Sequence, residues 1–295
     1  MSTQVLKKQS SYRLSDIAIM LIVGAAILVC LLPFLHIIAI SLSSKHEIMS
    51  NNVTFFPRDL DFNAYQIVFT DSRMLWSMGL TIVLTATYTL ISMVMSIAAA
   101  YPLTKDRLKG KTFFMMLIVF TMFFSGGMIP DYLLVRELGM LNNLSSLIFP
   151  TMISAFNLII LRTFFTSIPA SLEESAYIDG SSHFSTLIRI VLPLSLPVLA
   201  TLSLFYAVHR WNGFMDALFY ITKAELYPIQ LKLYQVVMNS MVTDLTAQEG
   251  ANQAEVIPEG LKAASIMFAT APILLVYPWL QRYFVSGVMV GAVKG

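Results

Sequence analysis

Long apolar runs separated by short polar stretches dominate the pattern of this chain. Six runs reach the roughly 20 mostly apolar residues that an α-helix needs to cross a bilayer. The polar and charged positions gather between them, so each run predicts one transmembrane helix. We therefore expect an all-α integral membrane protein with a single transmembrane domain over residues 1–295. The predicted spans cover about residues 16–42, 74–101, 112–135, 144–165, 193–220 and 263–286.

Composition supports a membrane rather than a water-soluble protein. Hydrophobic residues make up 57% of the chain and charged residues only 12%, whereas soluble domains are nearer one quarter charged. The net charge of +2 gives no indication of nucleic-acid binding. Cys30 is the one cysteine, so no intrachain disulfide can form. The first apolar run is too long for a signal peptide and no small-residue cleavage site follows it, so we expect an uncleaved first helix.

Basic residues alternate from one connection to the next. The N-terminus, the loop after the second span, the segment between the fourth and fifth spans and the C-terminal end are basic. The positive-inside rule therefore predicts that both termini are cytoplasmic, which agrees with an even number of spans. The loop at about 43–73, with Lys45, Arg58 and Arg73, fits this rule least well. The basic residues on the predicted cytoplasmic side are Lys7, Lys8, Arg13, Lys105, Arg107, Lys109, Lys111, Arg162, Arg189, Arg282 and Lys294.

A short cytoplasmic helix is predicted directly after the fourth span. Pro169 ends that span, and Ser171 and Glu174 have the spacing of a capping box, which predicts a new helix start. Gly180 is suited to ending this helix and to close approach of another chain. Ser182 predicts the start of a second short helix that runs to Leu192.

The small apolar positions of the first short helix fall on one face. Leu172, Ala176 and Gly180 are spaced at i, i+4 and i+8. From the residues alone, this helix pair is either an amphipathic connector at the lipid headgroups or a docking element for a partner.

A longer pattern in this loop resembles a known family. The order Glu174-Ser175-Ala176, three residues, Gly180, nine residues, Ile190, one residue and Leu192-Pro193 is similar to the Glu-Ala-Ala loop of bacterial ABC importer permeases. Ser175 stands where that family has a second alanine. The resemblance implies the type I ABC importer permease fold and a coupling loop at about 166–192, which docks in a cleft of an ATPase subunit. The ATPase-coupling residues it implies are Glu173, Glu174, Ser175, Ala176, Gly180, Ile190, Leu192 and Pro193.

Other segments resemble carbohydrate importer permeases of the maltose-permease type. They are Phe56-Pro57, Asn63-Ala64-Tyr65, Trp211-Asn212, residues 281–285 and residues 291–295. Residues 124–130 resemble a subgroup that imports alginate and pectin fragments. In some members of the wider group the C-terminal tail reaches the ATPase, which implies a contact at Lys294 and Gly295.

The resemblance also implies partners and a location. It implies a second related permease, two ATPase subunits, an extracytoplasmic solute-binding protein and an oligosaccharide substrate, at the inner membrane of a bacterial cell. The chain itself lacks a phosphate-binding loop, because Lys105 stands where Gly110-Lys111-Thr112 would need a preceding glycine. ATP and Mg²⁺ are therefore expected on the partner ATPase, and this chain is expected to have no catalytic residue, no cofactor and no metal site.

Polar residues inside the predicted spans are candidates for a substrate pathway. A tryptophan can stack on a sugar ring, while amides, carboxylates and guanidinium groups can bind hydroxyls. The alternatives are an interfacial belt for the group in the fifth span and a helix-packing hydrogen bond for the residue in the fourth. The candidates are Asn157, Arg210, Trp211, Asn212 and Asp216.

Two segments leave more than one structure open. Gly126-Gly127 and Pro130 either interrupt the third span beside a wet cavity or end it at the outer surface. The outer loop at about 221–262 is long for a connector, and its residues 227–237 are strand-like and apolar. It is either a contact for an external binding protein or for the partner permease, or a disordered or merely structural loop. The function alternatives are a transporter driven by an ion gradient, which would need acidic or coupling sites at the membrane centre, and a membrane-bound enzyme.

Overall fold

The chain is described from a computed structural model, which covers residues 14–248 and 259–292. Within these ranges the backbone is mostly helical, and an isolated bridge joins Ser43 to Leu60. Among the described residues, three helices are long and apolar enough to cross a bilayer, α1 (Leu14–Ser41), α4 (Ser72–Ala100) and α14 (Glu259–Ala292). They correspond to the first, second and sixth predicted spans.

Each of the other three predicted spans belongs to a bent helix pair, and in the second and third pairs one partner is a short helix that the sequence placed in the loop at about 166–192. The pairs α5 (Lys111–Phe123) with α6 (Met128–Glu137), and α7 (Ala155–Ser167) with α8 (Ala170–Ile178), bend by 115° and 69°. The helical stretch His183–Leu194 meets α11 (Leu196–Asn212) at 83°. If each bent pair is one span, the described chain has up to 6, as expected.

The break that the sequence indicated at Gly126-Gly127 is present in the third span, because Gly127 has a φ of 91° and turns the chain between α5 and α6. Two other predicted span boundaries were wrong. The fourth does not begin near 144, because residues 148–154 are turns and α7 starts at Ala155 behind its N-cap Ser154. The fifth is interrupted at Gly213 and continues as α12 (Met215–Tyr220).

The strand-like reading of residues 227–237 was also wrong. Most of that segment lies in α13 (Ile229–Gln248), which packs on α4 and α14. Tertiary packing overrides a local β-propensity of this kind.

The remaining elements are short. They are α2 (Lys45–Met49), α3 (Asn63–Thr70), the 3-10 turns η1 (Pro102–Thr104), η2 (Leu144–Leu147) and η4 (Ala224–Leu226), α9 (His183–Thr186), the π-helix η3 (Leu187–Val191) and α10 (Leu192–Leu194).

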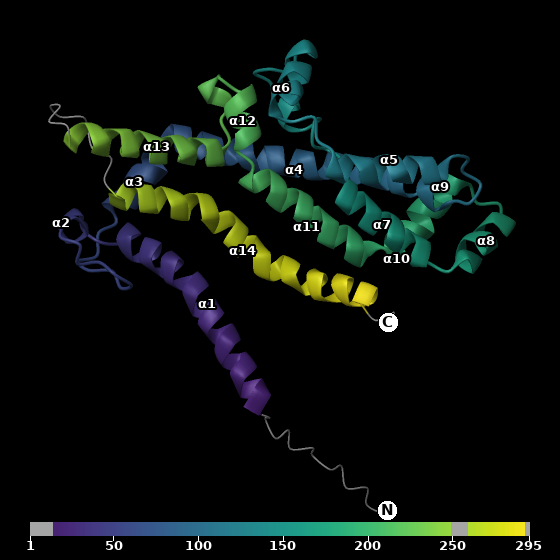
Figure 1. The fold of residues 1–295 in the computed structure, drawn as a ribbon, viewed down its shortest axis with the longest axis horizontal. Coiled ribbons are helices and arrows are strands. Elements are labelled where there is room, and N and C mark those ends of the chain that lie inside the picture. The colour runs from purple at the N-terminus through teal and green to yellow at the C-terminus, as the bar shows by residue number, and fades with distance from the viewer. Residues whose placement is uncertain (1–13, 249–258, 293–295) are drawn as a thin grey trace, which may run out of the picture.

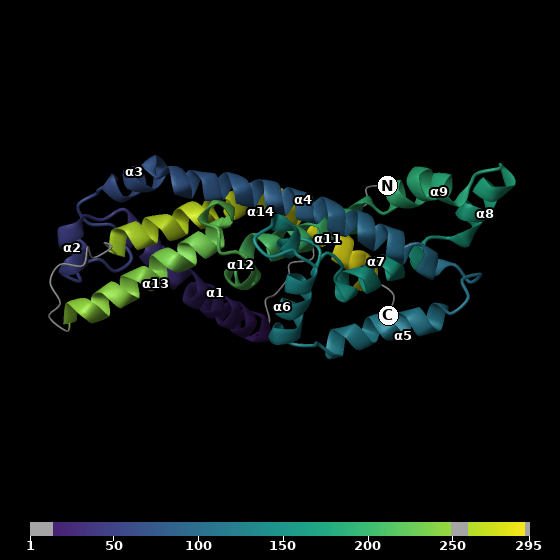
Figure 2. The same ribbon diagram turned by 90° about the horizontal axis from the view of Figure 1, so that it is seen from above.

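The bundle centres on α11. It packs against α4 and α14, and α7 packs on α4 (Figure 1). One core cluster includes Tyr88, Leu161 and Leu202 between α4, α7 and α11, and a second includes Trp211 and Ile229. Figure 2 shows α5 set apart from α4, with α6 turned away after the break. Buried serines and threonines on α4 allow close helix packing, as is common within membranes.

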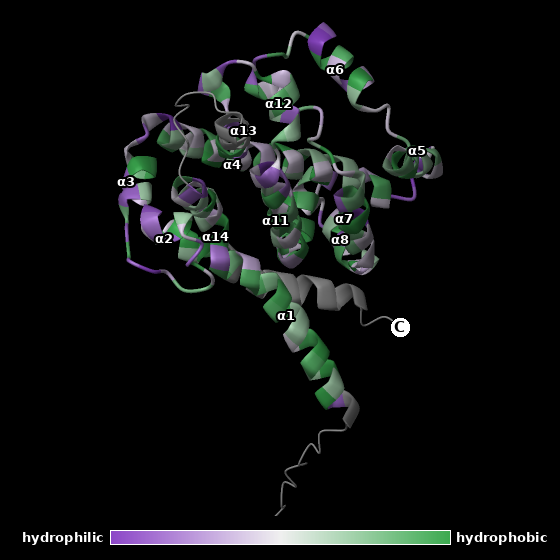
Figure 3. Ribbon diagram, turned by 60° about the vertical axis from the view of Figure 1, so that its left-hand side comes forward, coloured by the Kyte–Doolittle hydropathy of each residue, from purple (hydrophilic) through white to green (hydrophobic). Residues whose placement is uncertain are grey.

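The two ends of the bundle carry different elements. Figure 1 shows α2 and α3 at one end and α8 and α9 at the other. Helix α1 extends away from the body and is apolar along its length (Figure 3). Its last turns pack against α14, while large side chains from Ile17 to Leu35 are exposed.

Candidate functional site

Helix α8 is defined by turns at both ends. It begins at Ala170, and its N-cap Pro169 offers no side-chain hydrogen bond, so the predicted capping box of Ser171 and Glu174 was wrong. The extended ψ of 127° at Pro169 separates α8 from α7 instead. At the other end Gly180 has a φ of 80°, and the N–H of Ser181 donates to the carbonyl of Ala176 at 2.8 Å. The predicted role of Gly180 in ending the helix is confirmed.

Gly180→Val is expected to loosen the end of α8 by about 1–2 kcal/mol, because side chains are disfavoured at positive φ. A Cβ here would meet no atom within 4 Å, so the cost is backbone strain rather than collision. Hydrogen exchange at the Ser181 amide measures the loosening. Gly180→Asn, which tolerates this conformation better, should exchange more slowly than Gly180→Val. Equal protection in all three proteins would contradict the backbone explanation.

The second short helix starts at the predicted cap. The hydroxyl of Ser182 accepts a hydrogen bond from the N–H of Ser185. The helix continues as the π-helix η3 and ends at α10, where the Ser195 hydroxyl donates to the carbonyl of Val191 at 2.6 Å. Ile190 and Leu192 are half-buried in this stretch, and Pro193 is exposed at the bend into α11.

Helix α8 presents one face to the chain and one to its surroundings. Ala176 is buried at 8% exposure and Glu173 is half-buried, whereas Glu174 and Ser175 are exposed. The predicted face of Leu172, Ala176 and Gly180 is therefore divided, because Ala176 packs inside the chain.

Two large apolar side chains project from this end of the molecule. Ile178, at the end of α8, is 87% exposed, and Phe184 in α9 is 71% exposed. With Glu174 and Ser175 they form what we call the docking tip.

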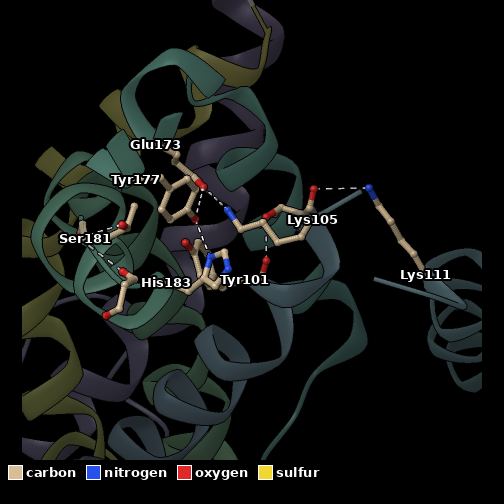
Figure 4. A network of polar contacts seen from close by, with 10 residues as sticks. Tyr101, Lys105, Lys111, Glu173, Tyr177, Ser181 and His183 are labelled. Carbon is tan, nitrogen blue, oxygen red and sulfur yellow. Dashed lines mark hydrogen bonds and ion pairs between the residues drawn. The ribbon is translucent and has the colours of Figure 1, made fainter. Parts of the chain in front are cut away.

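A polar network fixes the inner face of α8 to the loop after α4. Glu173 forms an ion pair with Lys105, whose Nζ also lies 4.0 Å from the ring centroid of Tyr101 (Figure 4). Both charged side chains are partly buried. The pair therefore connects the docking tip to the end of the long helix α4.

Tyr177 and His183 extend this network across the turn between α8 and α9. The Tyr177 hydroxyl lies 3.3 Å from Glu173 Oε2 and 2.7 Å from His183 Nδ1. Because a phenol has one hydrogen and a carboxylate only accepts, the consistent arrangement has His183 donating to Tyr177 and Tyr177 donating to Glu173. Burial raises the pKa of Tyr177 well above its ordinary value, which keeps this donor protonated.

Arg210 and Asp216 form a buried corner between α11 and α12. Arg210 is 2% exposed, and its two terminal nitrogens bind both carboxylate oxygens of Asp216 at 2.5 and 2.9 Å. It also donates to the carbonyls of Leu147 and Gly213. A Cβ at Gly213 would lie 2.6 Å from Arg210 Nη2, so only glycine fits there without a shift. This geometry supports a structural role for Arg210 rather than the predicted contact with substrate.

The other pathway candidates lie in different surroundings. Trp211 is buried, and its Nε1–H donates to the carbonyl of Ala269 at 3.3 Å. It also borders an apolar cleft between α4, α11 and α14. Asn212 is exposed and borders none of the described clefts. Asn157 is 5% exposed and lines a separate cleft between α4, α7 and α11.

Some predicted features lie beyond the reach of the structure. Lys294 and Gly295 fall outside the described residues, so their contact with an ATPase stays a prediction. Within residues 14–248 and 259–292, no group of histidine, cysteine and acidic side chains is arranged to hold a metal ion.

Sequence reasoning missed several residues that hold α8 in place or form the walls of the cleft that Asn157 lines. Lys105 was assigned only to a basic loop, and Tyr88, Tyr177 and Tyr206 were not singled out. Their partners lie far away along the chain, so no local signal marks them. The exposed Ile178 was detectable in principle, as an isoleucine next to the polar Asp179-Gly180 turn.

A family model described as "Binding-protein-dependent transport system inner membrane component" matches residues 87–290. Protein LplC of Bacillus subtilis (strain 168) is 43% identical over 285 residues, covering 96% of each chain. A second relative from the same strain is the polygalacturonan/rhamnogalacturonan transport system permease protein YtcP. It is 43% identical over 268 residues, covering 91% of this chain and 94% of its own.

A solved structure has the same fold. It comes from a bacterial ABC transporter involved in the import of the acidic polysaccharide alginate. The TM-score is 0.83 and the identity 33%, with 92% of this chain and 99% of that chain covered.

Proposed function

Because this chain belongs to the family of binding-protein-dependent transport system inner membrane components, we propose that it moves acidic oligosaccharides across the inner membrane as one of two permease subunits. It is a permease of an ABC importer and not an enzyme, as the permease relatives indicate. The gradient-driven alternative is disfavoured, because a binding-protein-dependent system takes its energy from ATP hydrolysed on a partner.

The docking tip is the observation that carries the proposed coupling to an ATPase. It exposes Ile178 and Phe184 while the opposite face of α8 is held by the Glu173–Lys105 ion pair. A surface with exposed apolar side chains on a rigid support is suited to seat in a cleft of another protein. A push on the tip would reach α4 through that ion pair and shift the bundle between two arrangements.

The directions of the first and last helices support a cytoplasmic location for both termini. Helix α1 runs toward the α2–α3 end and α14 runs away from it, so the N-terminal end of α1 and the C-terminal end of α14 both lie away from the α2–α3 end (Figure 1). If the docking tip faces a cytoplasmic ATPase, the N-terminal end of α1 and the C-terminal end of α14 also lie toward the cytoplasm. ATP and Mg²⁺ would then be bound by two ATPase subunits, and a solute-binding protein would deliver substrate at the opposite side.

The substrate class is supported by the relatives. The names of YtcP and of the alginate importer both refer to acidic polysaccharides. A second permease subunit is supported by the exposed apolar helix α1, which has few partners within the described chain.

Ile178→Asp is expected to reduce ATPase co-purification with this chain by at least about tenfold, since seating a carboxylate in an apolar contact costs more than 1.4 kcal/mol. The measurement is vanadate-sensitive ATP hydrolysis in complexes isolated in mild detergent through a tag on this chain. Met49→Asp is the matched control, because Met49 is 74% exposed on α2 and lies outside both the docking tip and the candidate spans.

Co-purification of full activity with the Ile178 variant would refute the docking tip. Absence of any associated ATPase from the unsubstituted chain would refute the ABC importer itself.

A further inference from the structure

A cleft of ≈ 600 Å³ opens between α4, α7 and α11. Aromatic rings form much of its wall, and a few polar side chains also line it. This combination is typical of sugar sites, because the faces of pyranose rings pack on aromatic rings while their hydroxyls need hydrogen bonds. The lining residues are Tyr88, Thr151, Ser154, Phe156, Asn157, Leu204, Phe205, Tyr206, Val208 and His209.

The wall is held rigid by hydrogen bonds within the chain. The Tyr88 hydroxyl donates to the carbonyl of Thr151 at 2.7 Å. The Tyr206 hydroxyl lies 2.7 Å from the Ser96 hydroxyl and accepts from the N–H of Ser154 at 3.1 Å. Both tyrosine rings are therefore fixed in place, and a ligand would meet their faces rather than free hydroxyls.

Asn157 is different, because its side-chain amide is unused. Its backbone N–H donates to the Ser154 hydroxyl at 3.4 Å, but among the described residues its amide has no hydrogen-bond partner. The residue is only 5% exposed and lines the cleft. The amide atoms are not among the fully buried polar atoms without a partner, so they reach the open space of the cleft and are available to a ligand that enters it. His209, which is exposed, lines the same cleft.

The charge of the cleft favours an anion. The N-terminus of α7 opens into it, with Ser154 as N-cap and Phe156 and Asn157 in the first turn. This end of a helix carries partial positive charge and free N–H groups. None of the described lining residues is acidic. A different cleft beside α6 and α12 contains Asp131 and Asp216, which would repel an anion.

We propose that this cleft binds one hexuronate unit of the substrate during transport. Its carboxylate accepts hydrogen bonds from the Asn157 amide and from the N-terminus of α7, and His209 lines the same cleft. Its ring packs on the aromatic wall of Tyr88 and Phe156. This assignment rests on the proposed function and names which residues of this chain select for negative charge.

The test compares acidic trisaccharides with their neutral methyl esters. Uptake of trigalacturonate and trimannuronate, and of each methyl ester, is measured in vesicles holding the complete importer with its binding protein. Asn157→Asp and His209→Asp are each expected to reduce uptake of the acids at least about tenfold relative to the unsubstituted chain. The esters should be affected much less. The uptake rate of each sugar by a variant is divided by the rate for the unsubstituted importer, so that the selectivity of the binding protein cancels in the comparison.

Asn212→Asp is the matched control, since it adds the same charge on α11 outside the cleft. Because His209 is exposed, its variant still tests the site if the substitution at the buried Asn157 prevents folding. If His209→Asp leaves the acid-to-ester ratio unchanged, the hexuronate site is overturned. Uptake of neutral cellotriose but of neither acid by the unsubstituted importer also overturns it and leaves the permease function standing. No uptake of any sugar would overturn the proposed function instead.

Discussion

Asp216→Leu is expected to destabilise the fold by about 3–5 kcal/mol, because it leaves a buried guanidinium without its carboxylate. Arg210 is 2% exposed and its pairing with Asp216 is bidentate. At roughly 2–4 °C per kcal/mol, the midpoint of thermal unfolding in detergent should fall by on the order of 10 °C. Fluorescence-detected size exclusion after heating provides the measurement.

Two further variants isolate the charge. The double variant Arg210→Met with Asp216→Leu should recover much of the stability, since apolar replacements of a buried ion pair are often tolerated. Glu137→Leu removes one partner of the surface pair with Arg136, whose side chains are 52% and 71% exposed, and should change stability by less than about 1 kcal/mol. A normal midpoint for the Asp216 variant would show that the corner does not hold the fold.

Glu173→Lys is expected to uncouple ATP hydrolysis from transport. It sets two ammonium groups against each other where Glu173 now pairs with Lys105. We expect ATPase subunits to bind still, because Glu173 faces inward, while sugar moved per ATP falls at least about tenfold. Lys105→Glu with Glu173→Lys restores opposite charges and should recover most of the coupling.

A second ion pair in the same region serves as the control. Asp106 is 99% exposed and pairs with Lys111, away from α8. Asp106→Lys should leave the sugar-to-ATP ratio close to normal. Unchanged coupling in Glu173→Lys, or no recovery in the double reversal, would show that movement reaches the bundle by another route.

Local features were predictable from sequence, and long-range contacts were not. The ends of α4, the role of Gly180 and the cap at Ser182 follow from hydropathy and turn chemistry within a few residues. The Lys105–Glu173 pair joins positions 68 residues apart, so no local pattern announces it. The role of Arg210 could not be decided from sequence for the same reason. A sequence shows a costly charge in a span, but it does not show the carbonyls and the carboxylate that bind the guanidinium.

Boundaries failed where the backbone breaks inside an apolar run. Residues 144–154 and 213–214 lie in predicted spans, but 144–147 form the short element η2 and residues 148–154 and 213–214 are not helical. The carbonyls of Leu147 and Gly213 accept hydrogen bonds from Arg210 instead of from their own helix. Hydropathy measures solvent preference and is blind to such bonds. The aromatic cleft was hidden for a similar reason, since its walls come from three helices.

The π-helix between the docking tip and α11 has a consequence for how this segment tolerates insertions and deletions. A π-turn amounts to an α-helix with one residue added, and each residue of an α-helix turns the chain by about 100°. Deleting one residue within Leu187–Val191 would restore a regular α-helix and would leave the segment as apolar as before. It would also rotate Ile178 and Phe184 away from their present direction relative to α11. The extra residue therefore sets the direction in which the tip points relative to α11. A related sequence that lacks one residue in this segment should have its tip rotated by about 100°.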